Sequence, residues 1–204
     1  MRQFLTMKTI LFDLDDTLID TNYRQFSVIK HSIINLGESF NLDYSYYLEF
    51  RKRQKVSNSD FVIAHYPLIE IEEFRKAFSA NIEHENFLNL DTLIVDSSLL
   101  LKISIKYKIS LLSLRQNREN GIKQLKSLGI KNIFENIYFI KHQDKYVKAS
   151  FIENSKLKFD YYIGDSEIDK IAAKSNNILF FGVNSNIHNQ EKGLSINEIL
   201  VKLL

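Results

Sequence analysis

The sequence contains no cysteine among its 204 residues. Disulfides, thiol nucleophiles and zinc or iron–sulfur sites built on cysteine are therefore excluded. Its five histidines are widely scattered and form no His-Glu-x-x-His pattern. A zinc site made of histidines is therefore not expected either.

Long apolar runs and chain-breaking residues are also scarce. No apolar run approaches the roughly 18 residues of a membrane span. Residues 1–12 are interrupted by Lys8 and end at Asp13, so they are too short and too charged for a signal peptide. We therefore expect a cytoplasmic protein without a membrane partner. With one proline and six glycines, the chain has no Pro-rich or Gly/Ser-rich linker.

The charges nearly cancel, because 27 Lys and Arg face 25 Asp and Glu for a net charge of +2. No overall field attracts nucleic acid or acidic membranes, and we expect neither as a partner. Hydrophobic residues at 45% and charged residues at 25% match an ordinary globular protein. The length allows one domain, or one domain that carries a smaller inserted one.

Short apolar runs that alternate with helical segments predict an α/β fold. The predicted strands are Met7–Phe12, Tyr107–Leu114, Ile133–Ile140, Phe159–Ile163 and Ile178–Val183. The predicted helices among them are Asn117–Leu128, Ser166–Lys174 and Ser195–Leu203. Short connections imply right-handed crossovers, and hence a doubly wound, mainly parallel, Rossmann-like sheet covered on both faces.

The stretch 21–91 breaks this alternation. Four consecutive helices are predicted there, over Asn22–Leu36, Tyr44–Gln54, Ser59–Tyr66 and Ile69–Glu85. Such a block is too long for a crossover, so it predicts a small all-helical domain inserted into a core of residues 1–20 and 92–204. We expect it over the carboxyl edge of the sheet, where open α/β sheets bind ligands.

Asp13 and Asp15 follow the first predicted strand and are two residues apart. In an extended chain their side chains project to the same side, while Asp16 points away. Paired carboxylates allow one to serve as nucleophile or metal ligand and the other as proton shuttle. The alternative is that these acids only cap the following helix.

The whole string Ile-Leu-Phe-Asp-Leu-Asp-Asp-Thr-Leu, residues 10–18, resembles the first motif of the haloacid dehalogenase-like hydrolases, DxDx(T/V). Ser113 ends an apolar strand, as the Ser/Thr of the second motif does. Lys148, or else Lys145, falls where the third motif places its lysine. Residues 163–169 are similar to the fourth motif, GDxxxD. The resemblance covers residues from about 5 to 20 and from about 93 to 200. Four motifs in the expected order are far more specific than a single motif.

The resemblance implies a role for each matching residue. It implies a phosphatase with a helical cap between the first two motifs, in which Asp13 is the nucleophile and Asp15 the general acid and base. The implied Mg²⁺ ligands are the carboxylates of Asp13 and Asp165 and the backbone carbonyl of Asp15. The remaining roles are phosphate binding by Ser113 and Lys148, support of the metal shell or of Lys148 by Asp169, and further support by Thr17 and Gly164.

Two assignments stay open in the sequence. Lys148 is preferred to Lys145 because it reads as the start of a helix, but neither is followed by the proline that would settle the choice. Arg115 follows Ser113 by two residues and is predicted to bind a substrate phosphate or carboxylate. Its alternative is an ion pair with a nearby acid such as Glu119. The charge run 51–55 is more simply a solvated helix face.

The expected function is a Mg²⁺-dependent phosphatase for a small phosphorylated metabolite, such as a phosphosugar or a phosphoglycolate-like acid. Asp15 argues against a dehalogenase, which needs no general acid. A phosphomutase or phosphotransferase of the same fold, and a non-catalytic binding protein that retains it, are the alternatives. A receiver-like module would lack the helical insertion. The oligomeric state is left as monomer or homodimer.

Overall fold

The computed structural model describes residues 7–54, 57–183 and 193–204. The chain forms two compact units. One comprises the residues up to Asp20 together with Thr92–Leu204, and the other is the insertion Thr21–Asp91.

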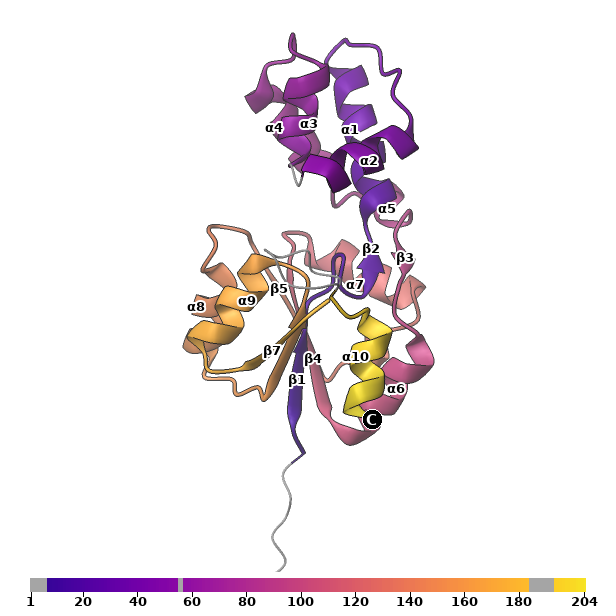
Figure 1. Ribbon diagram of the computed structural model, residues 1–204. Helices are drawn as coiled ribbons and strands as arrows, with labels where there is room; N and C mark the ends of the chain where they lie inside the picture. Colours follow the sequence, from indigo (N-terminus) through magenta and orange to yellow (C-terminus); the bar gives the residue numbers. More distant parts are fainter. Residues whose placement is uncertain (1–6, 55–56, 184–192) are drawn as a thin grey trace, which may run out of the picture. The chain divides into compact units, whose positions relative to one another are not determined.

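A parallel sheet forms the centre of the first unit (Figure 1). Its strand order is β5-β4-β1-β6-β7, and every neighbouring pair is parallel. The strands are β1 (Thr9–Phe12), β4 (Lys108–Leu114), β5 (Asn136–Ile140), β6 (Tyr161–Gly164) and β7 (Leu179–Gly182). This confirms the predicted α/β class and places β1 in the middle of the sheet.

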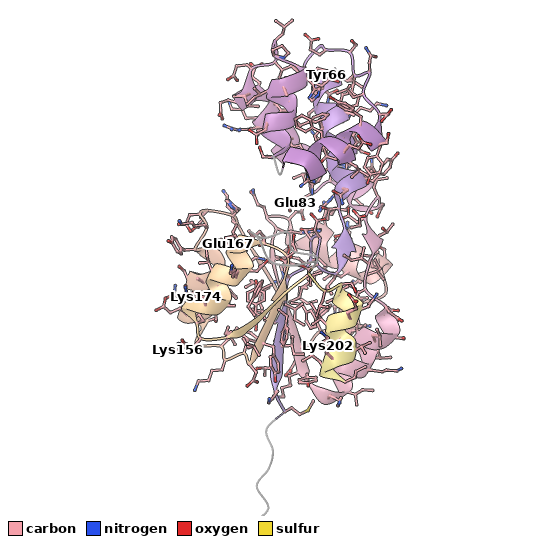
Figure 2. The ribbon with its side chains drawn as sticks, viewed as in Figure 1. Tyr66, Glu83, Lys156, Glu167, Lys174 and Lys202 are labelled. Atoms are coloured by element: carbon pink, nitrogen blue, oxygen red, sulfur yellow. The ribbon has the colours of Figure 1, made fainter. Side chains whose placement is uncertain are left out.

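Helices cover both faces of the sheet, because successive side chains of a strand point to opposite sides. Ile10 and Phe12 of β1 pack in one cluster with residues of α6 (Ser97–Lys106), α7 (Arg118–Ser127) and α10 (Ile196–Leu203). Leu11, between them, packs with α8 (Val147–Ser155) and α9 (Glu167–Ser175). Figure 2 shows Lys174 of α9 and Lys202 of α10 on the outer surfaces of these opposite layers.

The inserted unit is helical, as predicted. It contains α1 (Asn22–Asn35), α2 (Tyr44–Gln54), α3 (Asn58–His65), α4 (Ile71–Asn81) and α5 (Glu85–Leu88). Its core is largely aromatic, with Phe26, Tyr47, Phe61 and Phe74 buried together. Among the described residues, no helix has both the length and the apolar character needed to span a membrane.

Several boundaries differ from the sequence prediction. The single helix predicted over Ile69–Glu85 is wrong, because helix α4 ends at Asn81 and a separate helix, α5, follows. His84 caps the start of α5, where its ring nitrogen accepts the Asn86 N–H. Helix α6 was not predicted, because its sequence SSLLLKISIK is too uniformly apolar to show a helical period. The predicted strand Ile133–Ile140 begins only at Asn136, after a 3₁₀ turn over Lys131–Ile133.

Two short strands lie where the chain leaves and re-enters the core. They are β2 (Ile19–Asp20) and β3 (Thr92–Leu93), and they pair antiparallel. Strand β2 directly precedes the insertion and β3 directly follows it. A strand of two residues is too short to show an alternation of apolar and polar side chains. The sequence therefore does not predict them.

Candidate active site

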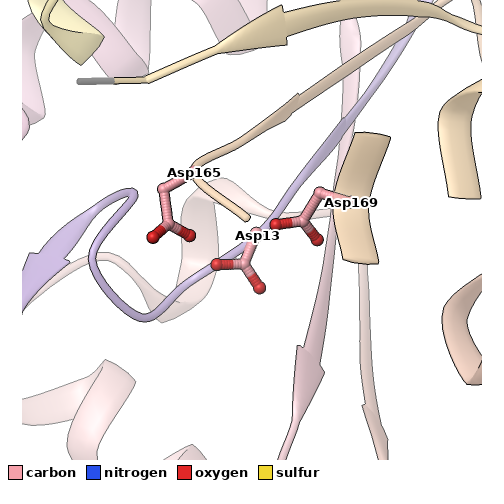
Figure 3. Close-up of side chains that lie close together, drawn as sticks. All are labelled: Asp13, Asp165 and Asp169. Carbon is pink, nitrogen blue, oxygen red and sulfur yellow. The ribbon is translucent and has the colours of Figure 1, made fainter. Parts of the chain in front are cut away.

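Three carboxylates converge at the carboxyl ends of β1 and β6. Phe12 of β1 is paired with Ile163 of β6, and the Asp13 N–H donates to the Ile163 carbonyl at 2.9 Å. Asp13 and Asp165 are therefore delivered by neighbouring strands to the same edge. Asp169, in the first turn of α9, joins them, and one oxygen of each carboxylate lies within 4.8 Å of the others (Figure 3).

One ammonium group lies between two of these acids. Lys148 Nζ of α8 donates to Asp13 Oδ1 at 2.5 Å and to Asp169 Oδ1 at 2.6 Å. The Lys148 residue is only 2% exposed. Lys145 is exposed, with its ammonium 5.1 Å from the centre of the Tyr146 ring. Of the two candidate lysines, Lys148 is thus the one in contact with the acids.

Asp169 is held rigidly by its neighbours. Its Oδ1 accepts from Lys148 and, at 2.8 Å, from the Tyr162 hydroxyl. Its Oδ2 accepts from the Ser166 backbone N–H at 3.1 Å and from the Ser166 hydroxyl at 2.5 Å. Both oxygens of this fully buried carboxylate are therefore occupied. Asp169 is suited to hold Lys148, while Asp13 and Asp165 are the better candidates for metal ligands.

Burial, and then the neighbouring carboxylates, disfavour the charged forms of Asp13 and Asp165. Burial raises the pKa of Asp13 to about 7, with Asp169 adding to the rise and Lys148 opposing it. Burial likewise raises the pKa of Asp165 to about 8, and the charges of Asp13, Asp169 and Asp16 contribute. Burial alone would lower the pKa of Lys148, but the two carboxylates outweigh it and raise that pKa. Three carboxylates thus share one ammonium, and their oxygens are ligands that suit a hard divalent cation.

The chain after β1 turns rather than continuing as a strand. The strand ends at Phe12, and Asp16 adopts a left-handed conformation with φ +57°. The Asp16 N–H donates to the Ile19 carbonyl at 2.8 Å. The predicted extended geometry therefore does not continue through Asp16. The charge of Asp16 also reaches the cluster, because it contributes to the raised pKa of Asp165.

Thr17 links two of the acids from within this turn. Its buried hydroxyl lies 3.2 Å from Asp13 Oδ2 and 3.3 Å from Asp165 Oδ1. Its single proton can serve only one of these oxygens at a time. Asp13 itself is 5% exposed, so the candidate nucleophile is buried rather than surface-facing.

Ser113 brings a buried hydroxyl to the neighbouring strand end. It belongs to β4, which pairs with β1. The residue is 1% exposed, and its Oγ has no hydrogen-bond partner among the described residues. A buried polar atom without a partner destabilises the fold and calls for an explanation. A ligand oxygen at this edge would supply the missing partner.

Arg115 is bound to protein groups rather than displayed to solvent. Its Nη2 and Nε donate to Asp15 Oδ1 and Oδ2 at 2.5 and 3.2 Å, and its Nη1 donates to Gln124 Oε1 at 2.5 Å. The guanidinium thus contacts Asp15 and Gln124, and its predicted binding of a substrate group stays a prediction. Glu119, the alternative partner, pairs instead with Lys123 at 3.2 Å.

Gly164 lies so close to Asp169 that no side chain fits. A Cβ at this position would be 2.6 Å from Asp169 Cγ, well inside van der Waals contact. The glycine therefore has a packing role beside the acid that holds Lys148.

Three residues of the site were missed in the sequence, namely Ser166, Tyr162 and Gln124. Ser166 and Asp169 form a capping box at the start of α9, a spacing that the sequence does carry. Tyr162 lies inside an apolar strand, and Gln124 inside a helix. Nothing local distinguishes either from an ordinary packing residue.

The comparisons with known proteins agree with this geometry. The sequence profile of the haloacid dehalogenase-like hydrolases matches residues 10–183. A search of curated proteins finds no match. Among solved structures, a haloacid dehalogenase-superfamily hydrolase from Geobacter sulfurreducens is 13% identical, with a TM-score of 0.69 and 97% of each chain covered.

Two further structures carry more specific names. A candidate phosphoglycolate phosphatase from Lactobacillus plantarum is 16% identical, with a TM-score of 0.67, and covers 98% of this chain and 100% of its own. A candidate β-phosphoglucomutase from Thermotoga maritima is 21% identical, with a TM-score of 0.65 over 97% and 98% of the two chains. At these identities the structures share the fold. The profile spans most of the chain, including the strands β1, β4, β5, β6 and β7, and the chain belongs to the haloacid dehalogenase-like hydrolases.

Proposed function

We propose that the protein is a Mg²⁺-dependent phosphatase that hydrolyses a small phosphomonoester, such as a phosphosugar or a phosphoglycolate-like acid. The observation that carries this proposal is the buried Asp13 carboxylate, held by Lys148 within a cluster of acids. The Ser113 hydroxyl, buried without a partner at the next strand end, supports a phosphoryl oxygen as ligand. A candidate phosphoglycolate phosphatase among the similar structures is consistent with this choice.

The reaction follows from the roles of the residues. In the first step an Asp13 oxygen bonds to phosphorus, the bond to the substrate alcohol breaks, and Asp15 gives its proton to that leaving oxygen. In the second step Asp15 takes a proton from water as the water oxygen attacks the aspartyl-phosphate. Inorganic phosphate leaves and the Asp13 carboxylate is restored.

Lys148 and Ser113 would bind the oxygens of the transferring group and stabilise the charge that develops on them. Mg²⁺, held by the carboxylates of Asp13 and Asp165 and the backbone carbonyl of Asp15, would offset the repulsion between an anionic nucleophile and a phosphate dianion. Asp169 would keep Lys148 in place.

Phosphate release from a nitrophenyl phosphate, with and without Mg²⁺, tests the activity. We expect turnover that is lost in excess chelator, restored by Mg²⁺ and poorly supported by Ca²⁺, whose coordination is looser and higher. A panel of phosphorylated metabolites then identifies the substrate class. Full activity in excess chelator would contradict the metal site, and absence of turnover on the whole panel would favour a non-catalytic binding protein.

Phosphomutase activity is the second candidate, favoured by the β-phosphoglucomutase candidate among the similar structures. A mutase returns the phosphoryl group to the sugar, whereas a phosphatase releases it to water. Incubation with a hexose 1-phosphate and a trace of the corresponding bisphosphate separates the two. Isomerised sugar phosphate without free phosphate would favour the mutase.

The helical unit Thr21–Asp91 is proposed as the cap that selects the substrate. The four motifs address only the phosphoryl group, so discrimination among substrates requires other residues. Replacing 21–91 with a short linker should leave weak activity on nitrophenyl phosphate and remove discrimination among metabolites. A folded, capless core with unchanged selectivity would contradict this role.

The acid cluster predicts a pH-dependent stabilisation by Mg²⁺. The pKa values of Asp13 and Asp165 are raised to about 7 and about 8, above their unfolded values. Their contribution to the stability of the metal-free protein is therefore lost as the pH rises from about 4 to about 8. Mg²⁺ competes with protons for these carboxylates. Mg²⁺ should thus raise the melting temperature more at about pH 8 than at about pH 5, and an equal shift at both would contradict the assignment.

Gly164→Ala should damage the site through Asp169. The new Cβ would lie 2.6 Å from Asp169 Cγ, and the acid has no free space because it is fully buried. We expect a loss of about 1–3 kcal/mol in the free energy of unfolding, measured by denaturant titration, together with reduced turnover of the folded protein. The matched control is Gly121→Ala, whose Cβ would come closest to the Phe139 ring, at 2.7 Å. It should destabilise without lowering the turnover of the folded fraction, and a similar turnover loss in both would contradict the role of Gly164.

A further inference from the structure

The Asp15 carboxylate is bound by the buried Arg115. The Arg115 guanidinium contacts both oxygens of Asp15, at 2.5 and 3.2 Å, and Arg115 is 2% exposed. We propose that Arg115 is the positioning residue for Asp15, and that it holds this carboxylate in the place from which it exchanges protons with the leaving group and with water. This inference rests on the proposed phosphatase function, because it concerns the acid and base of that reaction.

Arg115 is itself fixed by the core of the protein. Its Nη1 donates to the buried Gln124 of α7 at 2.5 Å. Its backbone N–H donates to the Ser113 carbonyl at 3.2 Å, directly after β4. Arg115 therefore joins three elements: its backbone follows β4, and its guanidinium contacts helix α7 and the turn after β1. A planar guanidinium that binds a carboxylate through two nitrogens also fixes the orientation of that carboxylate.

Asp15 needs such a holder because of where it lies. It precedes Asp16, where the chain reverses with φ +57°, so no regular strand fixes its side chain. The Asp15 side chain is 32% exposed, so it combines access from solvent with a fixed orientation. A carboxylate has about four acceptor sites, and the contacts from Arg115 use two of them. A group that transfers protons must be placed closely, since a displacement of about 1 Å can cost roughly 10²-fold in rate.

Direct binding of the substrate by Arg115 is the rival role. To reach a substrate group, the guanidinium would have to give up Asp15 or Gln124, and Arg115 is almost wholly buried. Breaking a buried, hydrogen-bonded charge pair is costly. Positioning of Asp15 requires no such rearrangement, which is why the structure favours it.

The dependence on the leaving group tests the proposal. Arg115→Met and Arg115→Lys should be compared with wild type on a series of aryl and alkyl phosphates of decreasing leaving-group acidity. A misplaced Asp15 matters most where the leaving oxygen needs a proton. We expect kcat to fall roughly 10²-fold for alkyl phosphates and less than about 3-fold for the most activated aryl phosphate, with KM nearly unchanged. Arg115→Met combined with Asp15→Asn should be no slower than Asp15→Asn alone.

Two matched variants complete the experiment. Arg118→Met removes an exposed arginine at the start of α7, three residues after Arg115, and should leave all rates unchanged. Gln124→Met removes the side-chain acceptor of Arg115 Nη1 and should give the same leaving-group pattern at smaller amplitude. If the Arg115 variants do not fold, the leaving-group dependence of Gln124→Met tests the positioning role of Arg115 instead.

Several outcomes would overturn the proposal. An equal loss on all substrates, following a loss of folded protein, would make Arg115 merely structural. A raised KM with unchanged kcat, additive with Asp15→Asn, would make it a substrate-binding residue. If Asp13→Asn is inactive while the Arg115 and Gln124 variants behave as wild type, only this inference fails. If Asp13→Asn retains wild-type activity, the proposed function itself fails.

Discussion

Asp13→Asn is expected to reduce phosphate release by roughly 10⁴-fold or more, because an amide cannot form the aspartyl-phosphate. The protein should remain folded. Asparagine has nearly the same volume, and its carbonyl oxygen can still accept from Lys148, which donates to Asp13 Oδ1 at 2.5 Å. Burial and Asp169 raise the pKa of Asp13, so removing this charge also relieves repulsion within the cluster. Single-turnover phosphate release and a thermal melt measure the two effects.

Asp16→Asn is the matched control for this prediction. Asp16 has φ +57°, a conformation that asparagine tolerates well. The residue lies three positions from Asp13, and its charge contributes to the raised pKa of Asp165. We expect a change in turnover of less than about 10-fold, in keeping with a charge that is not a reacting group. If Asp16→Asn were inactive while Asp13→Asn retained turnover, the assignment of the nucleophile would be wrong.

The placement of Asp13 and Asp165 at one edge of the sheet could be predicted from the sequence. Each follows a short apolar run, and parallel strands bring their carboxyl ends together. The structure pairs Phe12 with Ile163 and so delivers both acids to that edge. What failed is the extension of strand geometry through Asp16, because Asp16 is left-handed and its N–H donates to the Ile19 carbonyl of β2, a strand of only two residues.

The partners of the basic residues could not be predicted, since they are distant in the sequence. Arg115 was expected to bind substrate or Glu119, but its carboxylate partner is Asp15, 100 positions away. Lys148 was preferred to Lys145 in the sequence only because it reads as the start of a helix. They differ in the structure because α8 begins at Val147 and turns Lys148 into the core, whereas Lys145 precedes the helix and remains exposed. The two lysines thus differ in burial because of where the helix begins and which of its sides faces the core.

Lys148→Met should therefore have a large effect on both stability and activity. Lys148 is the ammonium that bridges Asp13 and Asp169, and its removal leaves buried carboxylates without a counter-charge. Breaking a buried pair in this way costs about 3–5 kcal/mol in the free energy of unfolding. Turnover should fall roughly 10³-fold, because the phosphoryl oxygens lose a charged ligand in the transition state. Denaturant titration and steady-state assays measure these quantities.

The pH dependence of the stability loss, together with a control variant, shows whether Lys148 stabilises the fold through its charge or through packing. With Mg²⁺ removed, the destabilisation by Lys148→Met should be smaller at about pH 5 than at about pH 8. At the lower pH, Asp13 and Asp165, whose pKa values are raised to about 7 and about 8, are protonated in the folded protein. Lys145→Met removes the exposed neighbour and should change stability by less than about 0.5 kcal/mol and leave turnover unaltered. A loss that is independent of pH would show that Lys148 contributes packing rather than charge. A larger effect from Lys145→Met would show that the lysine in contact with the acids has been misassigned.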